Sequence, residues 1–339
     1  MAQLPVVIAG AGIAGLANAI AFARQGRTVL LVEKRTGFEE VGAGIQISPN
    51  ASRVLLELGV TALVKQVVAP EQLDIRRWSE PFSAACETHG APFWVMRRAD
   101  LQTALLDTAR AMPGITLLVD RSVTDFKAGE NGFHVQLKRG SGAEETVEAS
   151  FLVGADGLWS KVRQAAGHAR QPVFSGYEAW RTLIPAESAP AFMRQPRMAL
   201  WMGGECHAVH YPVEAARQIN LVIVRKARIA PAHIEEWSLP PAQDEVENLG
   251  QSAALPLKHL IRAAPSWRRW PLFDAAPFTM GSPLIGDGHV ALVGDAAHPV
   301  LPFIAQGAAL GIEDAIELAA MLGPALARRS SPSVVVMLA

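Results

Sequence analysis

Cysteine is scarce in this chain, which limits both its redox chemistry and its metal chemistry. Cys86 and Cys206 are the only two among 339 residues. They lie far apart in the sequence, with no CxxC pair and no metal-ligand spacing around them. The sequence therefore predicts neither a disulfide framework nor a cysteine-based metal site. This usage is typical of a reducing compartment, so we expect a cytoplasmic protein without a bound metal.

Net charge is also almost absent. The formal charge is -1, and only 19% of the residues are charged while 50% are hydrophobic. A chain with so little excess charge does not attract nucleic acid or an anionic membrane surface through its overall field. Its length and apolar content suffice for a large buried core, arranged as two domains or one large one.

A long uninterrupted apolar run is missing as well. The N-terminal stretch LPVVIAGAGIAGLANAIAFA is apolar, but glycines interrupt it at Gly10, Gly12 and Gly15, and no basic segment precedes it. A signal peptide or a transmembrane helix is therefore not predicted. We also find no internal repeat and no low-complexity linker in the sequence.

The same stretch is better explained as a strand, a turn and a helix. Residues 5–9 are typical of a fully buried parallel strand, and residues 13–25 are rich in alanine with helical periodicity up to Gly26. Residues 28–33 form a second β-branched strand. The pattern predicts a βαβ unit at the start of the chain.

The rest of the chain divides into two kinds of pattern. Helices are expected over 51–66, 99–111 and 308–322, a meander of short strands over 115–119, 123–126, 133–138 and 146–153, a separate antiparallel sheet over 198–201, 207–213 and 219–225, and a returning buried strand over 289–293. The second sheet interrupts the first pattern. We therefore expect a discontinuous first domain of residues 1–176 and 281–339, with an inserted domain of residues 177–280.

The glycine-rich turn indicates a dinucleotide site. Gly10 permits the tight turn, Gly12 allows a pyrophosphate to approach the helix N-terminus, and Gly15 allows the helix to pack close to the strand. Glu33 ends the second strand, where a carboxylate accepts ribose hydroxyls and favours NAD or FAD over a 2′-phosphate. The alternative is a turn that only packs tightly. The later sequence GAG at 42–44 lacks the third glycine, and we interpret it as a loop.

Three motifs in order then indicate a family. GAGIAGL (10–16), VGADGLWSKVR (153–163) and VGDAAHPVLPFIAQGAALGIEDA (293–315) together resemble the single-component FAD-dependent aromatic hydroxylases related to para-hydroxybenzoate hydroxylase. The phrases VGAGIQISPN (41–50) and RRADLQ (97–102) are similar to the salicylate, 3-hydroxybenzoate and 6-hydroxynicotinate hydroxylases. The resemblance covers nearly all of the chain. It implies an α/β fold in which a Rossmann-like FAD-binding domain carries an inserted, mostly antiparallel β-sheet substrate domain.

The resemblance also implies which residues bind the cofactor. The expected FAD site consists of Gly10, Gly12, Ala14, Gly15, Glu33, Lys34, Arg35, Arg98, Asp156, Gly157, Asp295, Gly307 and Ala308. Glu33 would hold the adenosine ribose, Asp295 the ribityl chain, and Asp156 would belong to a motif linked to both FAD and NAD(P)H. Two structural alternatives stay open. Asp156 precedes glycine as in a common turn pair, and Arg163 is either functional or an ordinary solvated helix residue.

On the substrate side, strand alternation places His207 and Tyr211 on one face of a strand and His210 on the other. The resemblance implies that a histidine and a tyrosine four residues apart face the substrate, where a neutral imidazole takes a phenol proton. It also places Pro302 near the reactive edge of the flavin. The alternatives are a strand histidine satisfied by the backbone and a proline that stiffens its loop. Arg181 either meets an aromatic carboxylate or lies on the surface.

The implied activity is that of an enzyme, an NAD(P)H-dependent FAD monooxygenase. It would hydroxylate a small phenolic or hydroxy-aromatic acid with molecular oxygen through a flavin C4a-hydroperoxide. Neither the choice of NADH or NADPH nor the choice of monomer or homodimer follows from the sequence. One alternative is a halogenase-like oxidoreductase, although Trp180 and Thr182 match its WxWxIP phrase only in part. The other is a truncated FAD-binding protein with little turnover, suggested by the apolar tail ARRSSPSVVVMLA (327–339).

Overall fold

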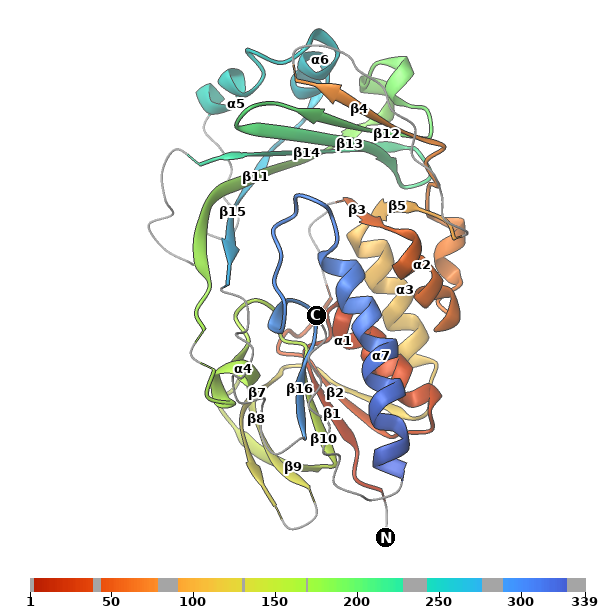
Figure 1. Ribbon diagram of the computed structural model, residues 1–339, viewed down its shortest axis with the longest axis vertical. Coiled ribbons are helices and arrows are strands. Elements are labelled where there is room, and N and C mark those ends of the chain that lie inside the picture. Colours follow the sequence, from red (N-terminus) through yellow and green to blue (C-terminus); the bar gives the residue numbers. More distant parts are fainter. Residues whose placement is uncertain are drawn as a thin grey trace.

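The computed structural model of the chain contains two main sheets, one above the other in Figure 1. It describes residues 3–38, 44–78, 91–129, 132–168, 170–227, 243–275 and 289–327. Most of the predicted GAG loop at 42–44 and all but the first residue of the apolar tail lie outside these ranges. Among the described helices, none combines the length and apolar character that crossing a bilayer requires.

The lower sheet is parallel and has five strands in the order β16-β10-β1-β2-β6. Its strands are β1 (Val6–Ala9), β2 (Val29–Val32), β6 (Ile115–Leu118), β10 (Phe151–Gly154) and β16 (Val290–Leu292). Helix α1 (Ile13–Arg24) connects β1 to β2, which pair in parallel. The predicted βαβ unit is therefore confirmed, and so is the return of the chain near residue 290 to this sheet.

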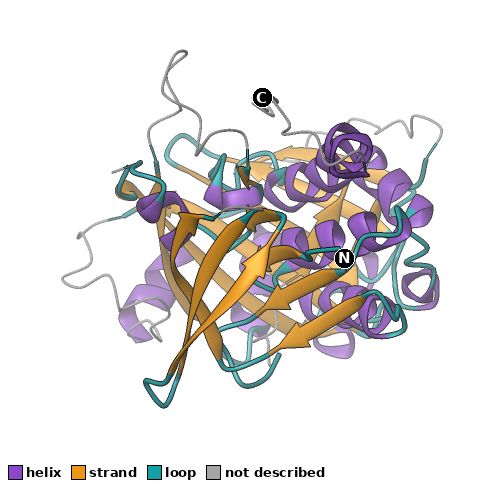
Figure 2. Ribbon diagram, turned by 90° about the horizontal axis from the view of Figure 1, so that it is seen from below, coloured by secondary structure: helices purple, strands orange, loops and turns teal. Residues whose placement is uncertain are grey.

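Each face of the parallel sheet is covered by a different layer. Helices α1, α3 (Arg98–Arg110) and α7 (Gly307–Ala327) share a core with Val6 and Ile8 on one face. Val7 and Ala9, which alternate with them, pack on the other face against a three-stranded sheet. That sheet consists of β7 (Arg121–Ala128), β8 (Phe133–Arg139) and β9 (Glu144–Ala149). Most helices therefore gather on one side of the strands when the molecule is seen from below (Figure 2).

The predicted meander is correct only in part. Residues 115–118 join the parallel sheet as β6, and the segment expected as one strand over 146–153 is two strands, because β9 ends at Ala149 and β10 begins at Phe151. The helix expected over 51–66 also divides. Helix α2 (Pro49–Glu57) ends just before Gly59, which has a φ of +82°, and a short 3-10 helix, η1 (Ala62–Lys65), follows.

The upper sheet has six strands in the order β15-β11-β14-β13-β12-β4. Its strands are β4 (Gln72–Arg77), β11 (Val173–Pro185), β12 (Arg197–Met202), β13 (Cys206–Val213), β14 (Gln218–Lys226) and β15 (Arg268–Asp274). The strands are antiparallel except for β4, which pairs in parallel with β12. Strand β4 comes from well before residue 177, whereas the inserted domain was expected to span residues 177–280. The expected insertion therefore did not include this strand.

The two faces of the upper sheet differ. Trp180 and Trp201 pack on the outer face with Leu257 and Leu260 of α6 (Leu255–Ala263), beside α5 (Gln243–Leu249). A fully buried side chain of this size contributes on the order of 2 kcal/mol through the hydrophobic effect. The inner face looks toward the lower part of the molecule, where β3 (Gly44–Ile47) pairs with β5 (Trp94–Arg97) (Figure 1). This face carries the predicted substrate-side residues.

Candidate functional site

The glycine-rich turn has the close contacts expected of a dinucleotide-binding turn. Gly10 has a φ of +98°, and a Cβ atom there would lie 2.5 Å from the carbonyl oxygen of Ala155. A Cβ atom at Gly15 would overlap the carbonyl oxygen of Gly10. Both positions require glycine for steric reasons, one because of its backbone conformation and the other because helix and turn approach so closely.

Gly12 differs from these two positions because it faces open space. Among the described residues, no atom lies within 4 Å of a Cβ built at Gly12. This residue is the N-cap of α1, and no side chain caps the helix. The N–H groups of the first turn thus lie beside a space that a phosphate can occupy, which fits a dinucleotide pyrophosphate.

Glu33 connects the end of β2 to this turn. One carboxylate oxygen accepts a hydrogen bond from Ala11 N at 2.9 Å, and the other accepts one from Arg35 N at 3.0 Å. The side chain is 8% exposed. Glu33 therefore holds the turn in place, and each oxygen keeps a further lone pair for a ligand. The side chains of Lys34 and Arg35 are exposed.

Ala14 lies where the first and third motifs meet. A Cβ atom at Gly294 or at Gly311 would come within 2.9 Å of the Ala14 methyl group. Gly294 also has a φ of +56°. The first turn of α1 therefore packs directly on the segment that carries Asp295, so two motifs that are far apart in sequence form one wall.

Asp156 caps a short helix. Its carboxylate accepts hydrogen bonds from Lys161 N at 2.7 Å, from Val162 N at 3.1 Å and from the Ser160 hydroxyl, at the start of α4 (Lys161–Ala165). These contacts give Asp156 a structural role. The cofactor role implied by the resemblance stays a prediction for Asp156 and for Gly157, which has a φ of +79° and open space around it among the described residues.

Asp295 lies in the 3-10 helix η5 (Gly294–Ala296), opposite the start of α7. Its surface is open to solvent, yet protein surrounds it closely enough that burial raises the pKa of its carboxyl, an effect that the nearby charges of Arg98 and His298 oppose. Asp295 is therefore accessible to a ligand although protein atoms surround its carboxyl. A Cβ atom at Gly307 would lie 3.9 Å from Asp295 Oδ1. Gly307, the first residue of α7 and followed by Ala308, therefore lies beside Asp295.

The predicted substrate-side residues lie on the inner face of the upper sheet. His207 and Tyr211 of β13 share this face, while Ala208 packs on the outer side and His210 lies there too. Burial lowers the pKa of His207 and raises that of Tyr211. His207 is therefore held in its neutral form, and Tyr211 keeps its phenol proton.

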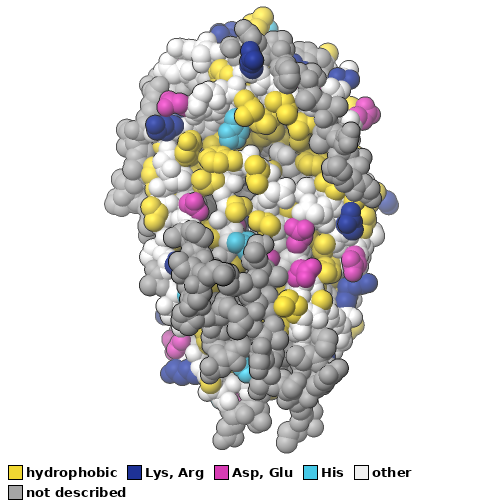
Figure 3. Space-filling model, in the orientation of Figure 1, with side chains coloured by type: hydrophobic (Ala, Val, Ile, Leu, Met, Phe, Trp, Pro, Cys, Tyr) yellow, Lys and Arg dark blue, Asp and Glu magenta, His cyan; other side chains and the backbone are white. Residues whose placement is uncertain are grey.

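The loop after η5 reaches this face of the sheet. Phe303, which follows Pro302, makes edge-on ring contacts with His207 at 5.7 Å and with Tyr177 at 5.3 Å between centroids. In Figure 1 the loop lies below the six-stranded sheet. Figure 3 shows hydrophobic side chains gathered in the upper half of this face of the molecule, where that sheet lies, with a histidine among them. The third motif therefore reaches from η5 to the inner face of the upper sheet.

Arg181 lies on the same inner face, and its guanidinium has no ion-pair partner among the described residues. Its guanidinium stacks over the Trp270 ring at 5.2 Å from the centroid, and its Nε has no hydrogen-bond partner among the described residues. Burial lowers its pKa, an effect that the nearby Tyr211 hydroxyl opposes and the Arg98 charge reinforces. Within the described part of the chain no carboxylate pairs with Arg181, so this position favours an anionic ligand.

Sequence reasoning missed the residues that hold Tyr211. Gln46 of β3 hydrogen-bonds to the Tyr211 side chain. Asn220 of β14 lies opposite Tyr211 and accepts a hydrogen bond from Gly44 N at 2.7 Å. Asn220 is the one polar residue inside the apolar stretch INLVIV, which was the available signal. Gly44 lies in strand β3 rather than in the predicted loop.

Comparisons with known proteins agree with this arrangement. Residues 3–335 match the family described as FAD binding domain. A 3-hydroxybenzoate 6-hydroxylase from Aquipseudomonas alcaligenes is 35% identical over 329 residues, which cover 94% of this chain and 80% of the relative. A 6-hydroxynicotinate 3-monooxygenase from Bordetella bronchiseptica is 28% identical, covering 92% of this chain and 81% of the relative.

Solved structures show the same similarity. A salicylate hydroxylase substrate complex superimposes with a TM-score of 0.79 and 26% sequence identity, covering 97% of this chain and 82% of that chain. The resemblance predicted from the three motifs and the expected α/β architecture with a second sheet are both confirmed.

Proposed function

The chain belongs to the FAD binding domain family, and from that premise we propose that it is an NAD(P)H-dependent FAD monooxygenase that hydroxylates a small hydroxy-aromatic acid. The observation that carries this proposal is the contact of Phe303 with both Tyr177 and His207. It brings the cofactor-side loop against the sheet face that holds a neutral histidine, a protonated tyrosine and an arginine with no carboxylate partner among the described residues. Relatives named for hydroxybenzoate and hydroxynicotinate substrates support it.

The residues of the lower domain fit FAD. The open space at Gly12 suits the pyrophosphate, Glu33 has lone pairs for ribose hydroxyls, and the exposed carboxylate of Asp295 suits the ribityl chain. When bound, FAD supplies the electrons taken from NAD(P)H and the activation of O₂. Delivery of the oxygen atom from a flavin C4a-hydroperoxide stays a prediction.

The sheet residues prepare the aromatic ring for attack. Neutral His207 accepts the proton of the ring hydroxyl, because a phenolate is more electron-rich than a phenol. Tyr211, whose side chain is held by Gln46, keeps its phenol proton and donates a hydrogen bond to the bound substrate. Pro302 stiffens the loop that carries Phe303 against this face and excludes water.

Arg181 suits the carboxylate of the acid. A partly buried cation without an anionic partner is costly, and a bound carboxylate removes that cost through charge-assisted hydrogen bonds. The planar guanidinium over Trp270 also leaves an edge available for bidentate binding. An aromatic acid held at Arg181 would direct its hydroxyl toward His207 on the same sheet face.

The test is turnover of the FAD-loaded protein against a panel of hydroxylated aromatic acids. NADH and NADPH consumption are followed separately, and products are identified by mass and NMR with isotopically labelled O₂. We expect one labelled oxygen atom in the product of at least one acid, with one nicotinamide oxidised for each product. Neutral analogues in which an amide replaces the carboxylate should bind about tenfold more weakly or worse.

Three results would overturn the proposal. One is FAD-loaded protein whose nicotinamide oxidation no acid in the panel stimulates. The second is a chloride-dependent, halogenated product, which would favour the halogenase-like alternative. The third is stimulated oxidation that yields only hydrogen peroxide with every acid, which would favour the FAD-binding protein with little turnover.

A further inference from the structure

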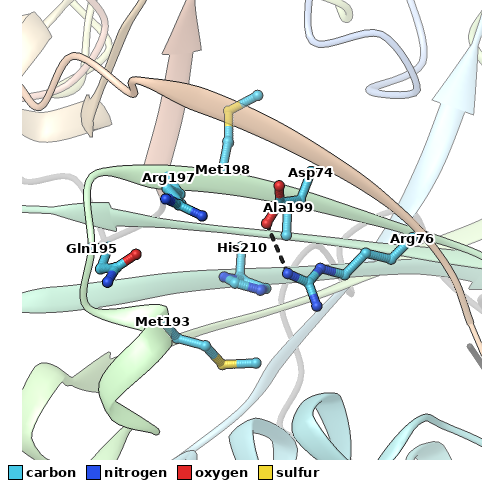
Figure 4. A pocket seen from close by; sticks show the side chains of 8 residues that line it. All are labelled: Asp74, Arg76, Met193, Gln195, Arg197, Met198, Ala199 and His210. Carbon is cyan, nitrogen blue, oxygen red and sulfur yellow. Dashed lines mark hydrogen bonds and ion pairs between the residues drawn. The ribbon is translucent and has the colours of Figure 1, made fainter. Parts of the chain in front are cut away.

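A polar pocket opens on the outer face of the six-stranded sheet, on the opposite side from His207 and Tyr211. It has a volume of about 160 Å³ and is lined by Asp74, Arg76, Met193, Gln195, Arg197, Met198, Ala199 and His210. Asp74, Ala199 and His210 lie side by side on three neighbouring strands. Because Ala199 has a small side chain, it leaves a space between the two larger ones (Figure 4).

His210 is the strongest indication that this space holds a ligand. Its side chain is only 5% exposed, and neither ring nitrogen has a hydrogen-bond partner among the described residues. Burial, together with the charge of Arg76, lowers its pKa to about 4, so the ring is neutral with one donor and one acceptor. Buried polar atoms are rarely left unsatisfied, which predicts an occupant with matching groups.

The charges around the pocket determine which sign of charge the ligand carries. Arg76 pairs with Asp74 at 2.7 Å, and the other Asp74 oxygen accepts from Gln72 at 2.7 Å. The Arg76 Nε has no partner in the described structure, and Arg197 lies exposed at the rim. Two arginines against one aspartate leave one positive charge, which favours a monoanion.

The walls and the volume set its shape. Met193 supplies an apolar surface and is nearly fully buried, whereas the side chain of Met198 points to the inner face and packs there with Tyr211. Figure 4 shows His210 and the Arg76–Asp74 pair facing the same space. A cavity of about 150 Å³ is large enough for one benzene ring. We propose that this pocket is a second ligand site, separate from the proposed active site, for a small monocarboxylate of about one aromatic ring.

The position of the pocket connects it to the proposed active site. His210 and Tyr211 are consecutive residues of β13 and point to opposite faces. A ligand in the pocket thus contacts the strand that carries the substrate-side residues. The inference itself does not depend on the proposed reaction, since it concerns only binding on the outer face.

Methionine methyl NMR of the FAD-loaded protein tests the inference, with benzoate as the probe. The signal of Met193 is assigned with Met193→Leu. We expect the Met193 signal to shift saturably with benzoate, and about tenfold more benzamide to be needed for the same shift, because the amide lacks the charge. Arg181→Met should leave this titration unchanged, which separates it from binding at the proposed active site.

Two variants of the pocket complete the test. Ala199→Leu fills the space and should abolish the shifts while leaving aromatic-acid binding at the flavin intact, measured by flavin absorbance. If Ala199→Leu does not fold, Arg197→Gln decides, with an expected weakening of benzoate binding by about threefold. The inference would be overturned by the absence of saturable shifts, by equal shifts in Ala199→Leu, or by equal binding of inorganic phosphate and benzoate.

Discussion

Arg163 donates a hydrogen bond from Nη1 to the carbonyl oxygen of Ala296 at 2.9 Å, across 133 positions of sequence. Its Nη2 donates to the carbonyl oxygen of Leu158 at 2.6 Å, and the side chain is only 1% exposed. Of the two alternatives for this residue, solvated or functional, the solvated one is wrong. Arg163 joins the second motif to η5, the turn that presents Asp295, and so acts as a positioning residue.

We expect Arg163→Met to lower both stability and FAD affinity. The substitution leaves two buried carbonyl groups unpaired, which costs about 3 kcal/mol in the free energy of unfolding. Urea unfolding and flavin retention after dialysis measure the two effects. Arg262→Met, at an exposed position of α6, serves as the control and should change stability by less than about 0.5 kcal/mol. Unchanged FAD affinity in Arg163→Met would rule out the positioning role.

Glu33→Gln should weaken FAD binding about tenfold to a hundredfold. The carboxylate accepts from Ala11 N and Arg35 N, whereas the amide NH₂ of glutamine would face one of these donors. Loss of one charge-assisted hydrogen bond corresponds to that range. Flavin titration followed by fluorescence gives the dissociation constant. Glu317→Gln, exposed on α7, should bind FAD as the native protein does, and equal affinities in both variants would contradict the assignment.

The geometry of the glycine-rich turn was predictable because its signals are local in sequence. Gly10, Gly12 and Gly15 lie within six residues, and each spacing has a direct steric meaning that the structure reproduces. The end of β2 places Glu33 without any knowledge of the rest of the fold. Alternation along one strand was likewise enough to separate His207 and Tyr211 from His210.

The remaining features depend on pairings that no local pattern contains. Strand β4 joins β12 across more than a hundred residues, and this pairing creates the pocket around His210. Gln46 reaches Tyr211 only because β3 lies beneath the upper sheet. Arg181 becomes an unpaired cation through the absence of a nearby carboxylate among the described residues, a property of the assembled face rather than of the phrase YEAWRTLIP.

Gly44→Ala should raise the KM of the aromatic substrate more than it changes FAD affinity. A methyl group at Gly44 would lie 2.5 Å from Asn220 Cγ and 2.7 Å from Tyr211 Cε2, so both side chains must move. Overpacking of this kind costs about 1–3 kcal/mol. Steady-state kinetics and flavin titration separate the two effects. Gly37→Ala, where no described atom lies within 4 Å of the added group, is the control. A KM equal to that of the native protein would show that Tyr211 does not need this position.

The His298–Asp314 pair should make stability depend on pH. Burial favours neutral His298, but the hydrogen bond of 2.8 Å and the charge of Asp314 outweigh it and raise the His298 pKa. The pair therefore stabilises the fold in full below the pKa of His298 in the unfolded state, which is about 6.5. This stabilisation is lost as the pH rises through the higher pKa that His298 has in the folded protein. Urea unfolding across this range should show a decrease on the order of 1 kcal/mol.

Asp314→Asn should reverse that dependence. Without the carboxylate, burial lowers the pKa of His298, so protonation then opposes folding and stability rises with pH through about 6.5. Asp314 also accepts a hydrogen bond from Gly294 N at 2.7 Å, so the variant is less stable at every pH, and only the sign of the slope tests the pair. Glu317→Gln should keep the native slope. An unchanged slope in Asp314→Asn would exclude His298 as its source.

His207 should produce an acid limb in the pH dependence of kcat/KM for the aromatic substrate. A general base must be neutral, and burial lowers the pKa of His207. Activity should therefore rise with pH through a value below about 6.5 and then level off, as far as this group is concerned. His207→Gln should remove the limb and reduce kcat about a hundredfold, whereas His134→Gln, exposed on β8, should change neither. A more acidic phenol needs less help from a base, so the loss in His207→Gln should shrink with such a substrate. A loss of equal size for both phenols would mean that His207 positions the ring without taking its proton.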